Sequence, residues 1–181
     1  MSLWLRVMAL IFSVSFVLIM SLMWLFEIDI FINKSPSMPM GIYLGFPADT
    51  VNHGNLVVVC LPKGANTDLY AKRGYLPHSK RCSQTSGLAP ILKRVVAMDG
   101  DEIEISFSGT KVNGLLIENS RLSEIDSRGE TIPHLPYGSF RLQSDEIFAL
   151  ATHASQSLDS RYFGTIKRAL IIARARPIFT F

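Results

Sequence analysis

One segment of the chain holds a serine in a setting suited to nucleophilic catalysis. It runs from Asn33 to Tyr43 and places Ser37 directly after Pro36 and two residues before Pro39. Proline fixes its own φ and restricts the residue before it. Ser37 keeps its own N–H between these stiffened positions, so its hydroxyl and N–H could face one point, as an activated serine with an oxyanion donor requires. The alternative is an ordinary proline-rich linker.

A second segment, residues 92–101, supplies a lysine that could serve as a base. On an extended strand Lys93 shares a face with Val95 and Ala97. Apolar neighbours remove hydration, which disfavours the ammonium and lowers the lysine pKa. A neutral lysine can accept the proton of a serine hydroxyl. The alternative is a lysine near a strand end whose aliphatic stem carries the amine to water.

A third segment, residues 155–164, combines a hydroxyl with a possible ion pair. Asp159 and Arg161 are close enough in sequence to pair and fix a turn, and Ser157 could orient a neighbouring group. A purely structural ion pair in a polar loop would explain the same residues.

An apolar run precedes all three segments. Val7 to Phe26 is a stretch of 20 residues without a charge, long enough to span a hydrocarbon core of about 30 Å as a helix. The run ends in Trp24-Leu25-Phe26 rather than in small residues. A retained anchor is therefore favoured over a cleavable signal sequence. Arg6 before the run and acidic residues after it predict a cytoplasmic N-terminus and an exported C-terminal part. We expect residues 1–30 to be the cytoplasmic tip and anchor, and residues 31–181 to be the exported domain.

Beyond the anchor, the pattern predicts a mainly β domain. Short β-branched or alternating stretches end at turn residues, and the Asn113-Gly114 pair is typical of a hairpin. Expected strands lie at residues 55–61, 91–98, 102–107, 115–117, 139–142, 147–152 and 170–176, and no long helical period follows the anchor. Residues 62–90 and 119–138, rich in turn formers or polar residues, are expected to be irregular loops.

The two cysteines and the charge balance indicate which covalent links and which ligands to expect. In an exported domain Cys60 and Cys82 predict a disulfide, although two free thiols or a zinc site remain alternatives. Residues 7–181 contain 17 basic and 15 acidic side chains, a balance that gives no reason to expect nucleic-acid binding. No common metal-ligand spacing is present, so no metal and no cofactor are expected.

Taken together and in order, these features resemble the type I signal peptidases, which are membrane-anchored serine proteases of the S26 type with a serine–lysine dyad. The resemblance rests on the anchor, the Ser-Met-Pro segment, the Lys-Arg-Val strand that leads to Gly-Asp, the Asn-Gly turn and Ser-x-Asp-Ser-Arg-aromatic-x-Gly. It covers the chain from about residue 30 to the end. It implies a signal-peptidase-like β domain with irregular loops behind one transmembrane helix.

The resemblance also implies roles for single residues. Ser37 corresponds to the nucleophile, Lys93 to the general base and Ser35 to a side-chain oxyanion donor beside the Ser37 N–H. Ser157 corresponds to the hydroxyl that orients the lysine, with Asp159 and Arg161 as its supporting pair.

Two departures point to a branch of the family. Pro39 follows Met38 directly, and Ala151-Thr152-His153-Ala154 replaces a Gly-Asp-Asn-Arg stretch. Both are similar to the TraF-type peptidases of conjugative transfer, as is Arg73-Gly74-Tyr75-Leu76-Pro77. The implied function is an inner-membrane endopeptidase, with its catalytic domain on the periplasmic side, that matures an exported precursor such as a conjugative pilin. Its implied partners are that precursor and membrane lipid. The alternatives are a general signal peptidase and a non-catalytic assembly factor of a DNA-transfer system.

Overall fold

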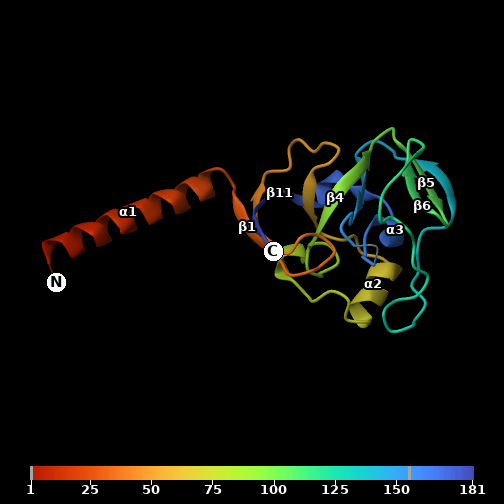
Figure 1. Ribbon diagram of the computed structural model, residues 1–181, viewed down its shortest axis with the longest axis horizontal. Helices are drawn as coiled ribbons and strands as arrows, with labels where there is room; N and C mark the ends of the chain where they lie inside the picture. Colours follow the sequence, from red (N-terminus) through yellow and green to blue (C-terminus); the bar gives the residue numbers. More distant parts are fainter. Residues whose placement is uncertain (1, 155) are drawn as a thin grey trace.

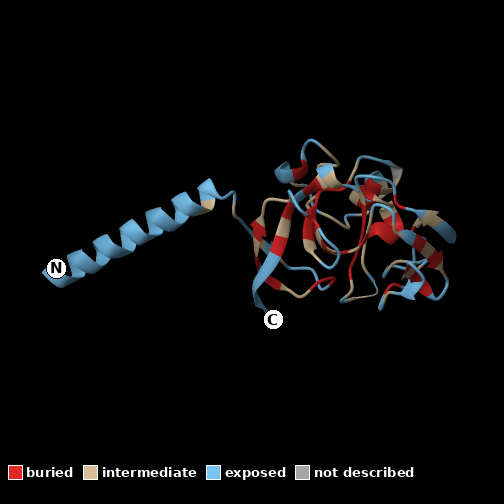
Figure 2. Ribbon diagram, turned by 90° about the horizontal axis from the view of Figure 1, so that it is seen from above, coloured by how far each residue is buried: buried red, intermediate tan, exposed pale blue. Residues whose placement is uncertain are grey.

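The computed structural model describes residues 2–154 and 156–181. Met1, at the expected cytoplasmic tip, and Ser155, the first residue of the third segment, lie outside the described residues. The N-terminal helix α1 (Leu3–Leu25) projects away from the rest of the chain and none of its residues is buried (Figures 1 and 2). It is the one helix among the described residues that is long and apolar enough to cross a membrane, consistent with an anchor or a signal sequence.

The remainder is mainly β, as the sequence predicts. Its larger sheet has seven antiparallel strands in the order β1-β2-β11-β3-β4-β9-β10. Their bounds are β1 (Asp29–Asn33), β2 (Gly41–Phe46), β3 (Leu56–Val59), β4 (Ile91–Met98), β9 (Glu146–Leu150), β10 (Ile166–Lys167) and β11 (Ile171–Thr180). β1 begins four residues after α1 ends, and the C-terminus lies beside this end of the domain (Figure 1).

A smaller sheet lies at the opposite end of the domain from α1. Its order is β7-β6-β5-β8, formed by β5 (Glu102–Ser106), β6 (Gly109–Val112), β7 (Leu115–Leu116) and β8 (Gly138–Arg141). The expected hairpin turn is present between β6 and β7. Asn113 and Gly114 both have positive φ, at 49° and 82°, as a type I′ turn requires.

Strand β4 shows how the core is built. Its residues alternate between buried and half-buried, and Ile91, Lys93, Val95 and Ala97 are the buried ones. Ile91 and Val95 belong to an apolar cluster with β3, β9 and β11, whereas Ala97 belongs to a second cluster shared with β5 and β6. β4 therefore connects both cores, and Lys93 lies on its buried side.

The sequence-based expectation for residues 62–90 is partly wrong. This segment contains helix α2 (Ala65–Lys72) and a 3₁₀ turn (Lys80–Cys82). An eight-residue helix is too short to show a clear apolar period, and its place is set by tertiary contacts such as the burial of Tyr70. A disulfide joins Cys60 to Cys82 across the segment.

Residues 119–138 also pack against the rest of the domain. Leu135 N–H donates to the Arg161 carbonyl at 2.8 Å, and Ser123 N–H donates to the Tyr162 hydroxyl at 3.1 Å. Ile132 is buried in a small cluster with Tyr70 and Tyr162. This loop is therefore tied to helix α3 (Ser160–Phe163), the element that follows Asp159.

Candidate active site

The serine segment is a loop between β1 and β2 organised by one side chain. Asn33, the last residue of β1, accepts the Ser35 N–H at 3.1 Å through its Oδ1 atom. Its Nδ2 atom donates to the carbonyls of Ser35, Met38 and Pro39 at 2.9–3.0 Å. Met38 is buried beneath the loop. These contacts hold Ser37 in one place, so a free linker does not describe this segment.

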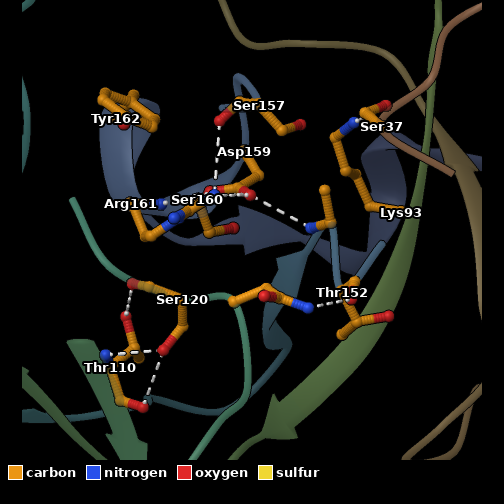
Figure 3. A network of polar contacts seen from close by, with 12 residues as sticks. Ser37, Lys93, Thr110, Ser120, Thr152, Ser157, Asp159, Ser160, Arg161 and Tyr162 are labelled. Carbon is orange, nitrogen blue, oxygen red and sulfur yellow. Dashed lines mark hydrogen bonds and ion pairs between the residues drawn. The ribbon is translucent and has the colours of Figure 1, made fainter. Parts of the chain in front are cut away.

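The side chains of Ser37 and Lys93 are in contact, although they come from different parts of the domain. The Ser37 hydroxyl comes from the β1–β2 loop, and the Lys93 amine comes from the third residue of β4. Lys93 Nζ lies 2.9 Å from Ser37 Oγ, and the two residues are only 3% and 7% exposed. Figure 3 shows the Lys93 side chain pointing toward Ser37. A charged amine donates at this distance, and a neutral amine can accept the hydroxyl proton instead.

Burial changes the acid–base behaviour of Lys93. Desolvation lowers its pKa from the ordinary value of 10.5 to about 8. The negative charge of Asp159 acts in the opposite sense, and the positive charge of Arg161 assists the lowering. A substantial fraction of Lys93 is therefore neutral slightly above neutral pH. That is the state in which an amine can act as a base.

Ser35 lies beside the Ser37 hydroxyl. Its Oγ donates to Ser37 Oγ at 3.0 Å and accepts the Ser37 backbone N–H at 3.3 Å. A hydroxyl hydrogen can rotate about the C–O bond. The Ser35 hydroxyl and the Ser37 N–H are thus two donors close to the Ser37 hydroxyl, and an oxyanion formed there would need donors of this kind.

Asp159 and Arg161 form a buried pair with no exposed side-chain surface. Arg161 Nη2 and Nε donate to the two Asp159 carboxylate oxygens at 2.6 and 2.7 Å. Asp159 Oδ2 also accepts the Ala151 N–H at 3.0 Å, and Arg161 Nη1 donates to the Arg121 carbonyl at 2.6 Å. The pair therefore fastens residues 156–161 to the end of β9 and to the 119–138 loop.

Ser157 lies where this fastened segment meets the serine–lysine pair. It lines one cavity of about 220 Å³ together with Ser35, Ser37 and Lys93. The Ser157 hydroxyl is buried and has no hydrogen-bond partner among the described residues. Ser157 is thus brought to the site, but no hydrogen bond joins it to Lys93 here, and its orienting role remains a prediction.

Sequence reasoning missed two residues of this site. Asn33 belongs to the serine segment, and asparagine is a common turn former, which is the sequence signal for its contact with the Ser35 N–H. Tyr75 lines the site cavity and a neighbouring one of about 230 Å³, which also share Ser157. Tyr75 lies three residues after the end of α2, and no local sequence pattern predicts that it lines the site.

A family model described as "Signal peptidase, peptidase S26" matches residues 2–180. The chain therefore belongs to this peptidase family, as the sequence resemblance predicts.

Two similar proteins place the chain more closely within the family. It is 32% identical over 154 residues to "Plasmid transfer protein TraF" from Escherichia coli, covering 82% of each chain. It is 35% identical over 154 residues to "Conjugal transfer protein TraF" from Agrobacterium fabrum, covering 83% of this chain and 82% of that one. A signal peptidase I structure from Enterococcus faecalis V583 aligns with a TM-score of 0.38 at 14% identity, covering 70% of this chain and 97% of that one.

Proposed function

We propose that this chain is a membrane-anchored serine endopeptidase that removes the signal or pro-peptide of an exported precursor, specifically a conjugative pilin precursor. The observation that carries the proposal is the 2.9 Å contact between the buried Ser37 hydroxyl and the buried Lys93 amine. Membership of a peptidase family and similarity to TraF transfer proteins support the substrate class and the setting.

Acylation would use the pair as nucleophile and base. Neutral Lys93 takes the hydroxyl proton while Ser37 Oγ bonds to the scissile carbonyl carbon. The Ser37 N–H and the Ser35 hydroxyl stabilise the oxyanion of the tetrahedral intermediate. The carbon–nitrogen bond then breaks, and the Lys93 ammonium returns its proton to the leaving amine. Ser37 remains as an acyl ester.

Deacylation would repeat the same steps with water. Lys93, neutral again, takes a proton from a water molecule that attacks the ester carbonyl, and Ser37 leaves as its hydroxyl form. An amine in place of water would give a new peptide bond with the same proton balance.

The membrane placement is the second part of the proposal. Helix α1 would act as a retained anchor, with residues 1–30 as tip and anchor and residues 31–181 as the catalytic domain on the periplasmic side of the inner membrane. The length and composition of α1 support this. Such an arrangement brings Ser37 near the membrane surface, where the cleavage site of a membrane-inserted precursor would be.

The direct test is precursor cleavage by the full chain in membrane vesicles. Ser37→Ala and Lys93→Ala should each abolish processing of a pilin-like precursor. Ser108→Ala and Lys63→Ala, which change an exposed serine and an exposed lysine, should process it like the unaltered chain. Full activity of Lys93→Ala would contradict the dyad.

Two other functions give different results in this assay. A general signal peptidase would cut ordinary secretory precursors as well as the pilin-like one. A non-catalytic assembly factor would cut neither, and Ser37→Ala would support conjugative transfer as well as the unaltered chain does. The family description favours the first alternative, whereas the short Ser37–Lys93 distance weighs against the second.

A further inference from the structure

Another polar cavity, which shares no lining residue with the cavity of the serine–lysine pair, is lined by three arginines. It has a volume of about 410 Å³ and lies where β3 begins, between β4 and the C-terminal half of β11. Arg94, Arg174 and Arg176 line it together with Phe46, Asn55 and four glycine or apolar residues, and none of these lining residues carries a carboxylate. Because three positively charged guanidinium groups line one cavity, the cavity favours binding of an anion.

These arginines are held in place but are not neutralised. Arg94 Nη1 donates to the Gly54 carbonyl at 2.8 Å, and Arg174 Nε donates to the Pro47 carbonyl at 3.0 Å. The Arg176 guanidinium lies over the Phe46 ring, 5.5 Å from its centre. None of the three forms a salt bridge within residues 2–154 and 156–181. Because a guanidinium has five N–H donors, most of theirs are left for a ligand.

The strand register places this arginine cavity close to the end of α1. Asp29, at the start of β1, pairs with Gly45, which pairs with Ala175 between two of the arginines. Two strand spacings separate Asp29 from Ala175, or about 10 Å. The headgroup layer outside the hydrocarbon core is itself about 5–8 Å thick. Because this distance is close to the headgroup thickness, the cavity can reach headgroup level if α1 spans the bilayer and the sheet edge at β1 rests on the membrane surface.

The surface beside the cavity is also suited to the headgroup layer of a membrane. Ile30 pairs with Leu44, and Leu44 pairs with Arg176, so an apolar row leads from β1 to the cavity. Ile30 and Ile32 are 51% and 65% exposed. Exposed isoleucines near unpaired arginines match the boundary between acyl chains and phosphates.

We propose that the cavity of Arg94, Arg174 and Arg176 binds the phosphate of an anionic phospholipid headgroup. Guanidinium groups bind phosphate oxygens through paired N–H donors, and basic pockets at membrane level bind lipid headgroups. The inference rests on the proposed anchoring of α1. Its effect would be to fix the height and tilt of the domain, since β1 connects the anchored end directly to the Ser37 loop.

Lipid binding to the full chain in detergent micelles tests this site without reference to proteolysis. Native mass spectrometry would count bound short-chain phosphatidylglycerol, with phosphatidylcholine and inorganic phosphate titrated separately. The expected result is at least five-fold more phosphatidylglycerol than phosphatidylcholine bound. That preference should be lost in Arg94→Gln/Arg174→Gln/Arg176→Gln.

Two further variants keep the test decisive. Arg176→Gln alone changes an exposed side chain without altering a backbone hydrogen bond, so it should fold and lose part of the preference. Lys63→Gln/Lys72→Gln/Arg141→Gln removes the same charge from exposed positions outside the cavity and should keep the preference. The three arginine substitutions should leave Ser37 chemistry in detergent intact, which separates this site from the proposed function.

Three outcomes would overturn the inference. Equal binding of both lipids by the unaltered chain would show no anionic preference. An unchanged preference in both arginine variants would place the lipid elsewhere. Inorganic phosphate bound as tightly as phosphatidylglycerol would indicate a site for soluble phosphate rather than for membrane lipid.

Discussion

Lys93 and Arg161 are the two cations buried within the described part of the chain, and they face opposite surroundings. Arg161 donates to both carboxylate oxygens of Asp159. Lys93 has a serine hydroxyl as its hydrogen-bond partner and forms no salt bridge among the described residues. Accordingly, the Arg161 pKa is raised by its hydrogen bond and by the Asp159 charge despite opposing desolvation, whereas desolvation lowers the Lys93 pKa.

The difference shows that burial alone does not make a base. A buried cation with a well-placed carboxylate stays charged and holds segments together, which suits Arg161. A buried amine without one loses its charge more readily and can accept a proton, which suits Lys93. We therefore expect substitutions at the two positions to affect different quantities, activity at Lys93 and stability at Arg161 and its partner.

Lys93→Arg should have the largest effect. Arginine keeps the positive charge but does not deprotonate, so it cannot act as a base. We expect precursor cleavage to fall by about 10⁴-fold or more. Single-turnover cleavage by the full chain measures this, and near-normal activity would mean that a neutral amine is not needed.

Asp159→Asn should produce the largest loss of stability. It leaves the Arg161 charge buried without its partner, which typically costs about 3–5 kcal/mol. Urea unfolding in micelles measures the change. The control is Asp99→Asn, which removes a partly exposed pair with Arg168 that is 2.7 Å long, and it should cost no more than about 1 kcal/mol. Equal losses in the two variants would contradict a structural role for the buried pair.

Ser35→Ala should reduce catalysis without removing it. If the Ser35 hydroxyl stabilises the oxyanion, its loss should lower kcat by about 10²- to 10³-fold and change KM little. Ser108→Ala, in the turn between β5 and β6, is the matched control and should leave kcat unaltered. A larger change in KM than in kcat would argue for a role in substrate binding instead.

Lys93→Met should stabilise the fold while abolishing activity. At pH 7 the lysine is charged and hydrated in the unfolded chain. Folding removes water from this charged amine, which costs free energy, and the lowered pKa in the folded protein reflects that cost. An apolar side chain of similar length avoids that cost, so the free energy of unfolding should rise by roughly 1–3 kcal/mol. The gain should shrink as pH rises from about 8 toward 10.5, since the neutral amine costs less to bury. A destabilised Lys93→Met would contradict the desolvation cost assigned to the buried amine.

Several elements could be read from the sequence because their signals are local. The strand expected at residues 91–98 has those bounds, and Asn113-Gly114 forms the expected hairpin. In contrast, β1 and β2 were not expected as strands. β1 continues an apolar region that reads as anchor, and the Ser37 segment beside it reads as linker. Their pairing with each other and with β11 is non-local, so no window of sequence contains it.

The site was predictable only as a set of residue types. Ser37 and Lys93 are 56 residues apart, and no periodicity states that their side chains meet. The family resemblance implied that pairing. The order of the strands in the larger sheet brings the β1–β2 loop close to β4, so that the two side chains can touch. The ties of Asp159 to Ala151 and of Arg161 to Arg121 likewise depend on where β9 ends and where the 119–138 loop packs.

The most direct test of the account is a titration of the Lys93 amine itself. NMR of lysine-labelled full chain, with the Lys93 signal identified by its absence in Lys93→Met, would follow the amine from pH 6 to pH 11. The account predicts a midpoint near pH 8, with kcat/KM rising about tenfold per pH unit below it and levelling above. A midpoint above pH 10 in the active protein would leave Ser37 without a proton acceptor and would contradict the account.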